Sequence, residues 1–123
     1  MANYKGATPF NIPRPIAMPD GWNAETLAAT KTLTLKDSMM QALDCGGSNR
    51  NVVLPSGHTK GRYFYIANKS DAAENITLQQ PDGSTTAATI NQNDMAIVYA
   101  ADSVAAGASS GWSLFFMLSG AIT

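Results

Sequence analysis

Alternating apolar and polar residues along most of the chain predict a series of short β-strands. The segment 62–68 (RYFYIAN) carries aromatic or branched side chains on both parities of the alternation. Such a strand has two faces to bury, so we expect it to be central in its sheet. The segment 112–118 (WSLFFML) is apolar on both parities in the same way. We expect the apolar faces of both strands to be buried by packing within the domain.

The remaining predicted strands are shorter and lie at 25–35, 39–43, 51–54, 75–80, 85–90 and 95–99. In the first of them, Leu27, Leu33 and Leu35 share one parity and threonines fill much of the other. This pattern favours one strand with a period of two residues. A short helix that starts at Asn23 and ends at Ala29 is the alternative.

Turn residues separate these strands. Pro81-Asp82-Gly83 predicts a type I turn with a bulge, because proline pre-sets the first corner and glycine accepts the left-handed position. The segment 100–111 (AADSVAAGASSG) contains mostly small residues and predicts a long loop. Short strands at intervals of about ten residues are typical of a sandwich or barrel. We therefore predict an all-β fold for residues 25–123, a single small jelly-roll-like β-sandwich or barrel of about eight strands, whose topology the spacing does not define.

Residues 1–24 predict an extended N-terminal arm. Four of the six prolines fall there, at positions 9, 13, 15 and 19, and their fixed φ angles disfavour a helix or a central strand. Apolar side chains are interleaved with them, whereas a disordered tail is poor in aromatic residues. We expect the arm to dock on a partner, on a sister subunit or on its own domain; a frayed terminus is the alternative. The residues expected to make contact are Tyr4, Phe10, Ile12, Arg14, Ile16 and Trp22.

The composition contains few charges. Asp, Glu, Lys and Arg make up 14% of the chain and the formal net charge is −1, where about 25% charged residues is typical. Few solubilising charges indicate a covered surface, although low-charge monomers also exist. The basic residues are scattered singly, which disfavours direct nucleic-acid binding. Neither a signal peptide nor a membrane-spanning run is recognisable, so we expect no membrane partner.

Catalytic and metal-binding side chains are scarce. The single cysteine, Cys45, excludes an intramolecular disulfide and cannot complete a structural zinc site with the single histidine, His58. Neither residue lies in a motif that activates a nucleophile. We expect His58 to be a solvated loop residue and Cys45 to be a small buried group or an inert loop thiol. The prediction is a protein without enzyme activity, cofactor or metal.

Two other sets of side chains carry weaker signals. Acidic pairs near loop ends match no calcium-loop spacing and are expected to be solvated: Asp71 with Glu74, and Asp94 with Asp102. Aromatic side chains on strands are usually core residues. Four of them offer a possible stacking platform for a sugar or a base, namely Tyr63, Tyr65, Trp112 and Phe115.

The order of features from Leu43 to Leu114 resembles that of tailed-phage capsid decoration, or cement, proteins. The segments that carry this resemblance are LDCGGSNRNVVLP, KGRYFYIANKSDAAENITLQQPDGST, ATINQNDMAIVYAADS and GWSLF. The likeness lies in the rhythm of strands and turns and includes no catalytic signature. It implies a jelly-roll or tulip-like β domain that follows an arm laced across neighbouring capsid subunits.

The resemblance also implies a function and partners. It implies a structural virion protein that binds the outer surface of a phage capsid and cements adjacent major capsid subunits. We expect a homo-oligomer, a trimer at a local threefold axis rather than a dimer, located on the capsid surface after assembly in the host cytoplasm. Related β domains occur in tail fibres and spikes, so a carbohydrate- or receptor-binding domain of a fibre or spike is the alternative.

Overall fold

The computed structural model describes residues 21–57, 60–101 and 111–120, and these ranges contain nine β-strands and no helix. The strands are β1 Trp22–Thr26, β2 Lys31–Thr32, β3 Met40–Asp44, β4 Arg50–Val53, β5 Tyr63–Asn68, β6 Ile76–Gln79, β7 Thr86–Ile90, β8 Met95–Ala100 and β9 Trp112–Leu118. The predicted all-β fold is confirmed. β9 coincides with the strand predicted at 112–118, and the bounds of β3 to β8 differ from the predicted ones by at most one residue.

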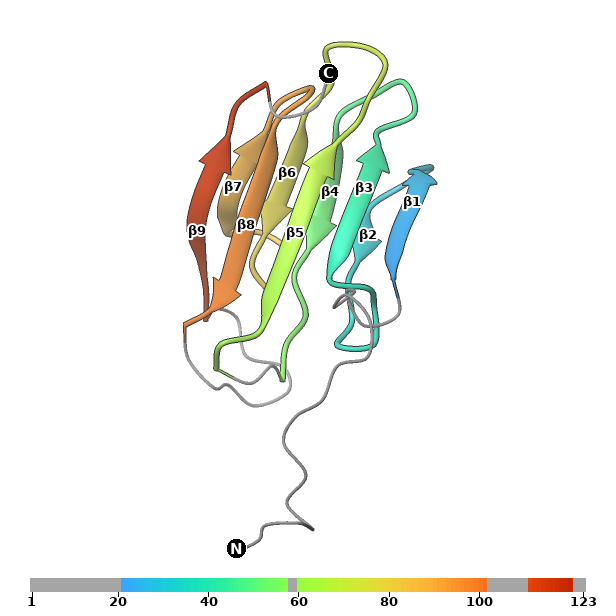
Figure 1. Ribbon diagram of the computed structural model, residues 1–123. Helices are drawn as coiled ribbons and strands as arrows, with labels where there is room; N and C mark the ends of the chain where they lie inside the picture. Colours follow the sequence, from blue (N-terminus) through green and yellow to red (C-terminus); the bar gives the residue numbers. More distant parts are fainter. Residues whose placement is uncertain (1–20, 58–59, 102–110, 121–123) are drawn as a thin grey trace, which may run out of the picture.

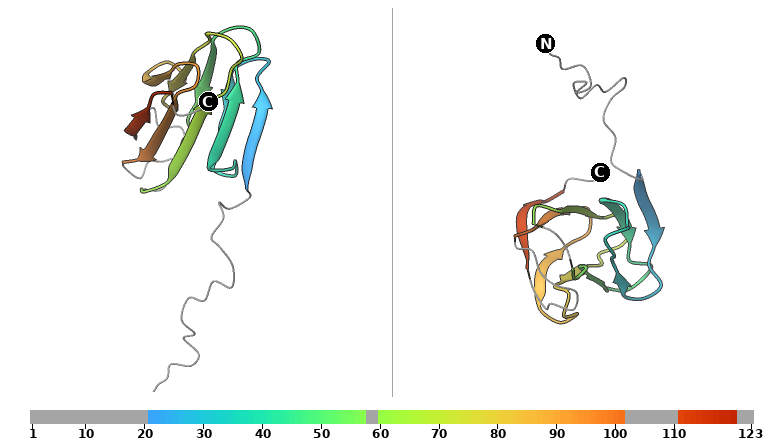
Figure 2. Two further views of the ribbon diagram at one scale, coloured as in Figure 1. Left: turned by 45° about the horizontal axis from the view of Figure 1, so that its top comes forward. Right: turned by 90° about the horizontal axis from the view of Figure 1, so that it is seen from below.

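The strands form two sheets that pack face to face (Figure 1). Sheet A has the order β1-β3-β5-β8-β9, and sheet B has the order β2-β4-β6-β7. β5 lies between β3 and β8 in the middle of sheet A, as predicted for 62–68. Viewed from below, the two sheets enclose one core (Figure 2). The fold is therefore a small β-sandwich.

The chain winds between the two sheets. From β1 to β6 each strand lies in the sheet opposite to the strand before it. Neighbours within a sheet are parallel along this part of the chain, because each turn of the winding returns the chain in the same direction. The hairpin β6–β7 ends the winding, and β8 and β9 are antiparallel to their neighbours. This connectivity differs from that of a jelly roll, which is built from antiparallel Greek keys.

The single strand predicted at 25–35 is wrong, and so is the short helix that was its alternative. The structure divides the segment into β1 of sheet A and β2 of sheet B. Leu27 and Leu33 are both buried in the core, whereas Leu35 is exposed. The leucines share a parity, but the chain changes sheets between Leu27 and Leu33. Unbroken alternation therefore did not mean an unbroken strand.

The core is formed by the inner faces of both sheets. Its completely buried members include Leu43, Val52, Phe64, Ile66, Ile76, Leu78, Ile90 and Val98. Trp112 at the start of β9 joins them, because its ring lies 5.6 Å from that of Phe64 and its Nε1 donates a hydrogen bond to the carbonyl oxygen of Pro55 at 2.9 Å. Successive residues of a strand point to opposite faces. The residues that alternate with these core positions therefore form the outer faces of the sandwich.

At one end of the sandwich, the loops that connect strands of the two sheets pack on one another and are joined by hydrogen bonds. The buried Asn68 side chain donates two hydrogen bonds to backbone carbonyls and accepts two from Ser70. Gly46, with φ of 67°, lies against the preceding crossing, and a Cβ at this position would be 2.8 Å from the carbonyl oxygen of Leu27. The close stacking therefore requires glycine at position 46.

The hairpin β6–β7 contains the turn predicted at Pro81-Asp82-Gly83. The backbone N of Gly83 donates to the carbonyl oxygen of Gln80 at 2.9 Å, and Gly83 has φ of 71°. The hydroxyl of Thr85 and the backbone N–H groups of Ser84 and Thr85 donate to the Asp82 carboxylate. These hydrogen bonds, that of the Thr85 side chain first, lower the pKa of Asp82 to about 2.

Candidate functional site

The predicted contact residues of the arm lie almost entirely outside the described residues. Trp22 is the exception, because it lies in β1 at the edge of sheet A. Its side chain is strongly exposed, at 63%. Residues 22–24, at the end of the predicted arm, thus belong to the sheet. The others fall within residues 1–20, namely Tyr4, Phe10, Ile12, Arg14 and Ile16.

The outer face of sheet A is apolar across all five strands, and we call it the apolar face. The pairing register places one residue from each strand in a row across it: Trp22, Met40, Tyr65, Ile97 and Phe116. The next row contains Ala24, Ala42, Ala67, Met95 and Leu118. Among the strand residues of this face, Asp44 at the end of β3 carries the only charge. The two rows are therefore apolar, and polar residues lie at the ends of the face, namely Thr26, Asp44 and Ser113.

A β-bulge in β9 adds an aromatic ring to the apolar face. The register of β8 and β9 shifts so that Phe115 is the extra residue of β9. Its ring lies 6.0 Å from the ring of Tyr63 and 6.1 Å from that of Tyr99, and both tyrosines belong to this face. Bulges re-aim side chains in this manner. Phe115 and Phe116, which we call the aromatic pair, therefore project together and remain 56% and 45% exposed.

At the end away from β9, the same apolar face has a depression. A depression of about 330 Å³, which we call the hollow, lies over β1 and β3. Ala24 and Ala42 form its floor, because their methyl groups fill little space, and Trp22 stands beside them. The polar part of the lining comes from Glu25, Thr26, Asp44 and Lys69. The apolar face thus combines a projection over β9 with a depression over β1 and β3.

The outer face of sheet B is polar by comparison. One row across it contains Asn51, Thr77 and Thr89, which pair with one another across β4, β6 and β7. Thr32 of β2 and Thr86 of β7 are exposed as well. Hydroxyl and amide groups hydrogen-bond to water, so this face is suited to solvent. The two outer faces of the sandwich therefore have opposite chemical character.

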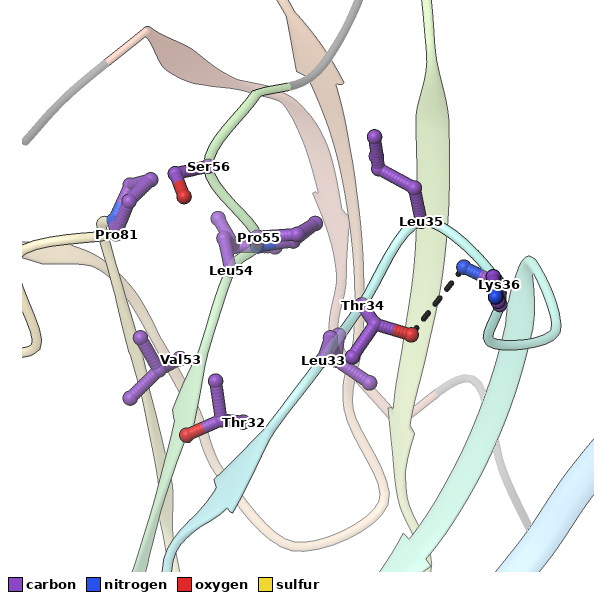
Figure 3. Close-up of a pocket in the computed structure, with 10 residues that line it drawn as sticks. All are labelled: Thr32, Leu33, Thr34, Leu35, Lys36, Val53, Leu54, Pro55, Ser56 and Pro81. Carbon is purple, nitrogen blue, oxygen red and sulfur yellow. Dashed lines mark hydrogen bonds between the residues drawn. The ribbon is translucent and has the colours of Figure 1, made fainter. Parts of the chain in front are cut away.

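A groove of about 540 Å³ lies along the end of sheet B (Figure 3). The segments that follow β2 and β4 form its walls, with Pro81 beside them. Leu35 and Pro55 give it apolar surface, and Lys36 is its one charged residue. The backbone N of Lys36 donates to Oγ1 of Thr34 at 3.2 Å. Because the lining contains no carboxylate, it supplies no acid–base pair.

Cys45 is completely buried and is a free thiol. Its Sγ lies 3.6 Å from the carbonyl oxygen of Asn75, and its backbone N donates to Oγ of Ser70 at 2.9 Å. Of the two predicted states, Cys45 therefore adopts that of a small buried group. His58 lies outside the described residues.

Two of the acidic residues expected to be solvated are buried instead. Oε1 of Glu74 accepts a hydrogen bond from the backbone N of Gly47 at 2.6 Å, and Oδ1 of Asp94 accepts one from Gly120 at 2.8 Å. The prediction was wrong for these two because each carboxylate accepts a hydrogen bond from the backbone of a neighbouring loop instead of facing solvent. Asp71 is exposed as expected, and Asp102 lies outside the described residues. In the part of the chain that the structure describes, no three His, Cys, Asp or Glu residues are grouped to hold a metal ion.

The four aromatic residues of the possible stacking platform divide between two faces. Trp112 is buried in the core and is unavailable to a ligand. Tyr63, Tyr65 and Phe115 lie on the apolar face. The prediction of a stacking platform is therefore wrong for Trp112.

The expectation that the sandwich buries all its apolar strand faces is also wrong. β5, β8 and β9 are neighbours in sheet A, and each carries apolar side chains on both faces. A two-layer sandwich buries only one face of each sheet. Three such strands in one sequence already indicate apolar surface outside the core, and this signal points to Phe116, which no motif singled out, and to Phe115, which was named only as part of the possible stacking platform.

Within the described ranges, no helix is long and apolar enough to span a membrane. The apolar face carries most of the large apolar side chains that are exposed in these ranges. Comparisons with protein-family models and with curated proteins found no match for this chain.

Proposed function

We propose that the protein is a non-enzymatic structural protein of a tailed-phage virion, which binds the outer surface of the capsid and cements adjacent major capsid subunits. The observation that carries the proposal is the apolar face, with Trp22, Phe115 and Phe116 exposed on it. Exposed apolar patches of this kind mark sites of protein–protein interaction. The resemblance of segments between Leu43 and Leu114 to capsid decoration proteins supplies the kind of assembly.

Cementing depends on many weak contacts made at once. Linked contacts reinforce one another, since the first to form raises the effective concentration of the rest. In a homo-oligomer, a trimer by expectation, each copy contributes to the shell one arm, the residues that precede β1. Contacts of the arm with neighbouring capsid subunits would hold the lattice together against the pressure of packaged DNA.

Deletion of residues 1–20 tests the arm. The deletion ends before β1, so every described strand is retained. We expect the truncated protein to bind emptied shells of its own phage at least about tenfold more weakly, because the linked arm contacts are lost. Co-sedimentation measures this binding, with Thr89→Lys on the outer face of sheet B as the control. Unchanged binding of the truncated protein would refute the role of the arm.

Electron microscopy of the full chain mixed with its phage tests the location. Density on the shell lattice is the expected result. Density at the tail would contradict a decoration role and would favour a fibre or spike.

The second candidate is a carbohydrate- or receptor-binding domain of a tail fibre or spike. It is favoured by the three rings of Tyr63, Tyr99 and Phe115, whose centroids are about 6 Å apart in each pair, since sugars stack on aromatic faces. Glycan-array binding that is lost in Phe115→Ala, with the fold intact, would support this candidate. Trp112→Ala does not test it, because Trp112 is a core residue.

A further inference from the structure

We infer that the apolar face is covered by further copies of this chain, with the aromatic pair of one copy seated in the hollow of the next. The inference goes beyond capsid binding, because it concerns contacts among copies of the protein itself. It rests on the homo-oligomer of the proposed function and assigns the apolar face to contacts among its copies, so that binding to the capsid falls to the arm and to the rest of the surface.

The first argument is complementarity of shape. The aromatic pair projects at the β9 side of the apolar face, and the hollow with its alanine floor lies at the β1 side. Four steps between strands at about 4.8 Å separate the two features by roughly 19 Å. Exposed rings at one side of a face can enter a depression at its other side only when two copies meet.

The second argument is symmetry. Rotation about an axis parallel to the strands brings β9 of one copy against β1 and β3 of another. Two copies related in this way stack their sheets, and three copies form a triangular prism with the apolar faces inside. Both the dimer and the trimer are closed assemblies, so each hollow receives an aromatic pair and each aromatic pair occupies a hollow. The trimer expected from the sequence is compatible with this contact.

The third argument is chemical. Apolar and aromatic side chains with few charges are typical of the buried centre of an interface. With about 200 Å² for a whole aromatic side chain, the exposed fractions of Trp22, Phe115 and Phe116 leave roughly 300 Å² of aromatic surface in water. This surface lies in two parts at opposite sides of the face, Trp22 on β1 and the aromatic pair on β9. In a ring, each copy makes the contact twice, and both halves of the face contribute to the roughly 800 Å² per copy that a stable interface buries.

The rim of the hollow fits an incoming ring as well. Lys69 lies in an exposed position at this rim. An ammonium group over the face of an aromatic ring is a favourable contact. The rim also carries the carboxylates of Glu25 and Asp44, which favour the positive edge of a ring rather than its face.

The bulge favours contact through the face rather than through the edge of β9. A continuous edge strand can add a neighbouring strand by backbone pairing. The extra residue Phe115 interrupts the ladder of β9 and turns its ring onto the apolar face. Packing of side chains is thus the mode of association that this edge allows.

Sedimentation velocity of the full chain over a concentration series tests the inference. We expect the wild type to sediment as a closed dimer or trimer. Phe116→Lys removes the projection and Ala24→Lys fills the hollow, and each should weaken association by about tenfold or more, as for central residues of an interface. Thr89→Lys places the same charge on the outer face of sheet B and should leave association unchanged. Circular dichroism verifies that each variant is folded.

A charge-swap variant distinguishes a specific contact from general stickiness. In the double variant Ala24→Glu/Phe116→Lys, every contact pairs a glutamate with a lysine. We expect association to recover relative to Phe116→Lys alone, because opposite charges then face each other across each contact. Failure to recover would contradict the pairing of the aromatic pair with the hollow.

Other results would overturn the inference. A wild type that stays monomeric at all concentrations, or a Thr89→Lys variant that dissociates as strongly as Phe116→Lys, would do so. If deletion of residues 1–20 abolishes association while Phe116→Lys preserves it, the arm holds the copies together instead. These measurements use no shells, so their failure leaves the capsid-binding experiments independent.

Discussion

The two outer faces of this sandwich come from one chain but have opposite chemistry. Sheet B presents the row Asn51, Thr77 and Thr89, whereas sheet A presents a row from Trp22 to Phe116. The inner faces of both sheets contribute to one core, so the chemical difference between the two sheets lies in their outer faces. A face that only met water would have no need of exposed Phe115 and Phe116. The contrast shows that sheet B meets solvent with polar groups, whereas the outer face of sheet A retains exposed aromatic rings, which we propose are buried by association of copies.

The largest expected effect separates the inner face of sheet A from its outer face. Phe64 is completely buried against Trp112, so Phe64→Ala should lower the free energy of unfolding by about 3–5 kcal/mol. The matched variant Phe116→Ala, measured in dilute solution where the chain is monomeric, should lower it by about 1–2 kcal/mol, because the ring is only partly buried in the single chain. Urea unfolding followed by circular dichroism measures both. Equal losses would show that Phe116 belongs to the core of the single chain.

The next effect concerns the packing of Gly46 against the end of β1, the strand that forms one side of the hollow. Gly46→Ala should destabilise by about 1–3 kcal/mol through its left-handed backbone alone. It should lose more because its Cβ would approach the carbonyl oxygen of Leu27 to 2.8 Å. Gly47→Ala is the control, since Gly47 also has positive φ but nothing lies within 4 Å of its added Cβ. A difference between the two variants in urea unfolding reports the close approach, and identical values would exclude it.

A smaller effect comes from giving sheet B the character of sheet A. Thr77 and Thr89 are directly opposite each other, so Thr77→Phe/Thr89→Phe should gain roughly 0.2–1 kcal/mol from a cross-strand aromatic pair. The same variant should become less soluble, because it now has an apolar patch on both sides. Thr77→Val/Thr89→Val controls for β-propensity without rings. If the phenylalanine variant remains as soluble as the wild type, exposed aromatic rings do not drive association in this fold.

The smallest effect lies in the β6–β7 hairpin of sheet B and depends on pH. The pKa of Asp82 is lowered to about 2 in the folded chain, against about 3.9 for an unfolded aspartate. A lowered folded pKa stabilises above the unfolded value and loses this contribution as pH falls from about 4 toward 2. The difference in unfolding free energy between wild type and Asp82→Asn should therefore be constant above about pH 5 and shrink below pH 4. A difference that does not change with pH would mean that ionised Asp82 does not stabilise the turn.

The sequence predicted the strands well where alternation coincides with one sheet. β9 and the turn at Pro81-Asp82-Gly83 lie where the pattern placed them. The pattern failed at 25–35, because two leucines of equal parity reach the core from different sheets. The parallel pairing of β1, β3 and β5 could not be predicted from the alternation pattern either, because it depends on how the chain passes between the two sheets.

The candidate site was predictable only in part. Trp22 was singled out as a contact residue and is exposed on β1. Phe115 was taken for a ring on a strand face, but its direction depends on a bulge that alternation alone does not reveal. The hollow exists because Ala24 and Ala42 come into register through long-range pairing. Residue types were thus readable from the sequence, and their juxtaposition required the fold.

Hydroxyl-radical footprinting of the full chain tests the central claim most directly. Wild-type protein at a concentration where it associates is compared with monomeric Phe116→Lys, and the oxidation of each side chain is measured by mass spectrometry. We predict that Trp22, Met40 and Phe115 are protected in the wild type, while the reactivity of exposed Leu35, which lies off the apolar face, is the same in both proteins. Equal oxidation of Trp22, Met40 and Phe115 in the two proteins would contradict the claim that the apolar face of sheet A is buried between copies.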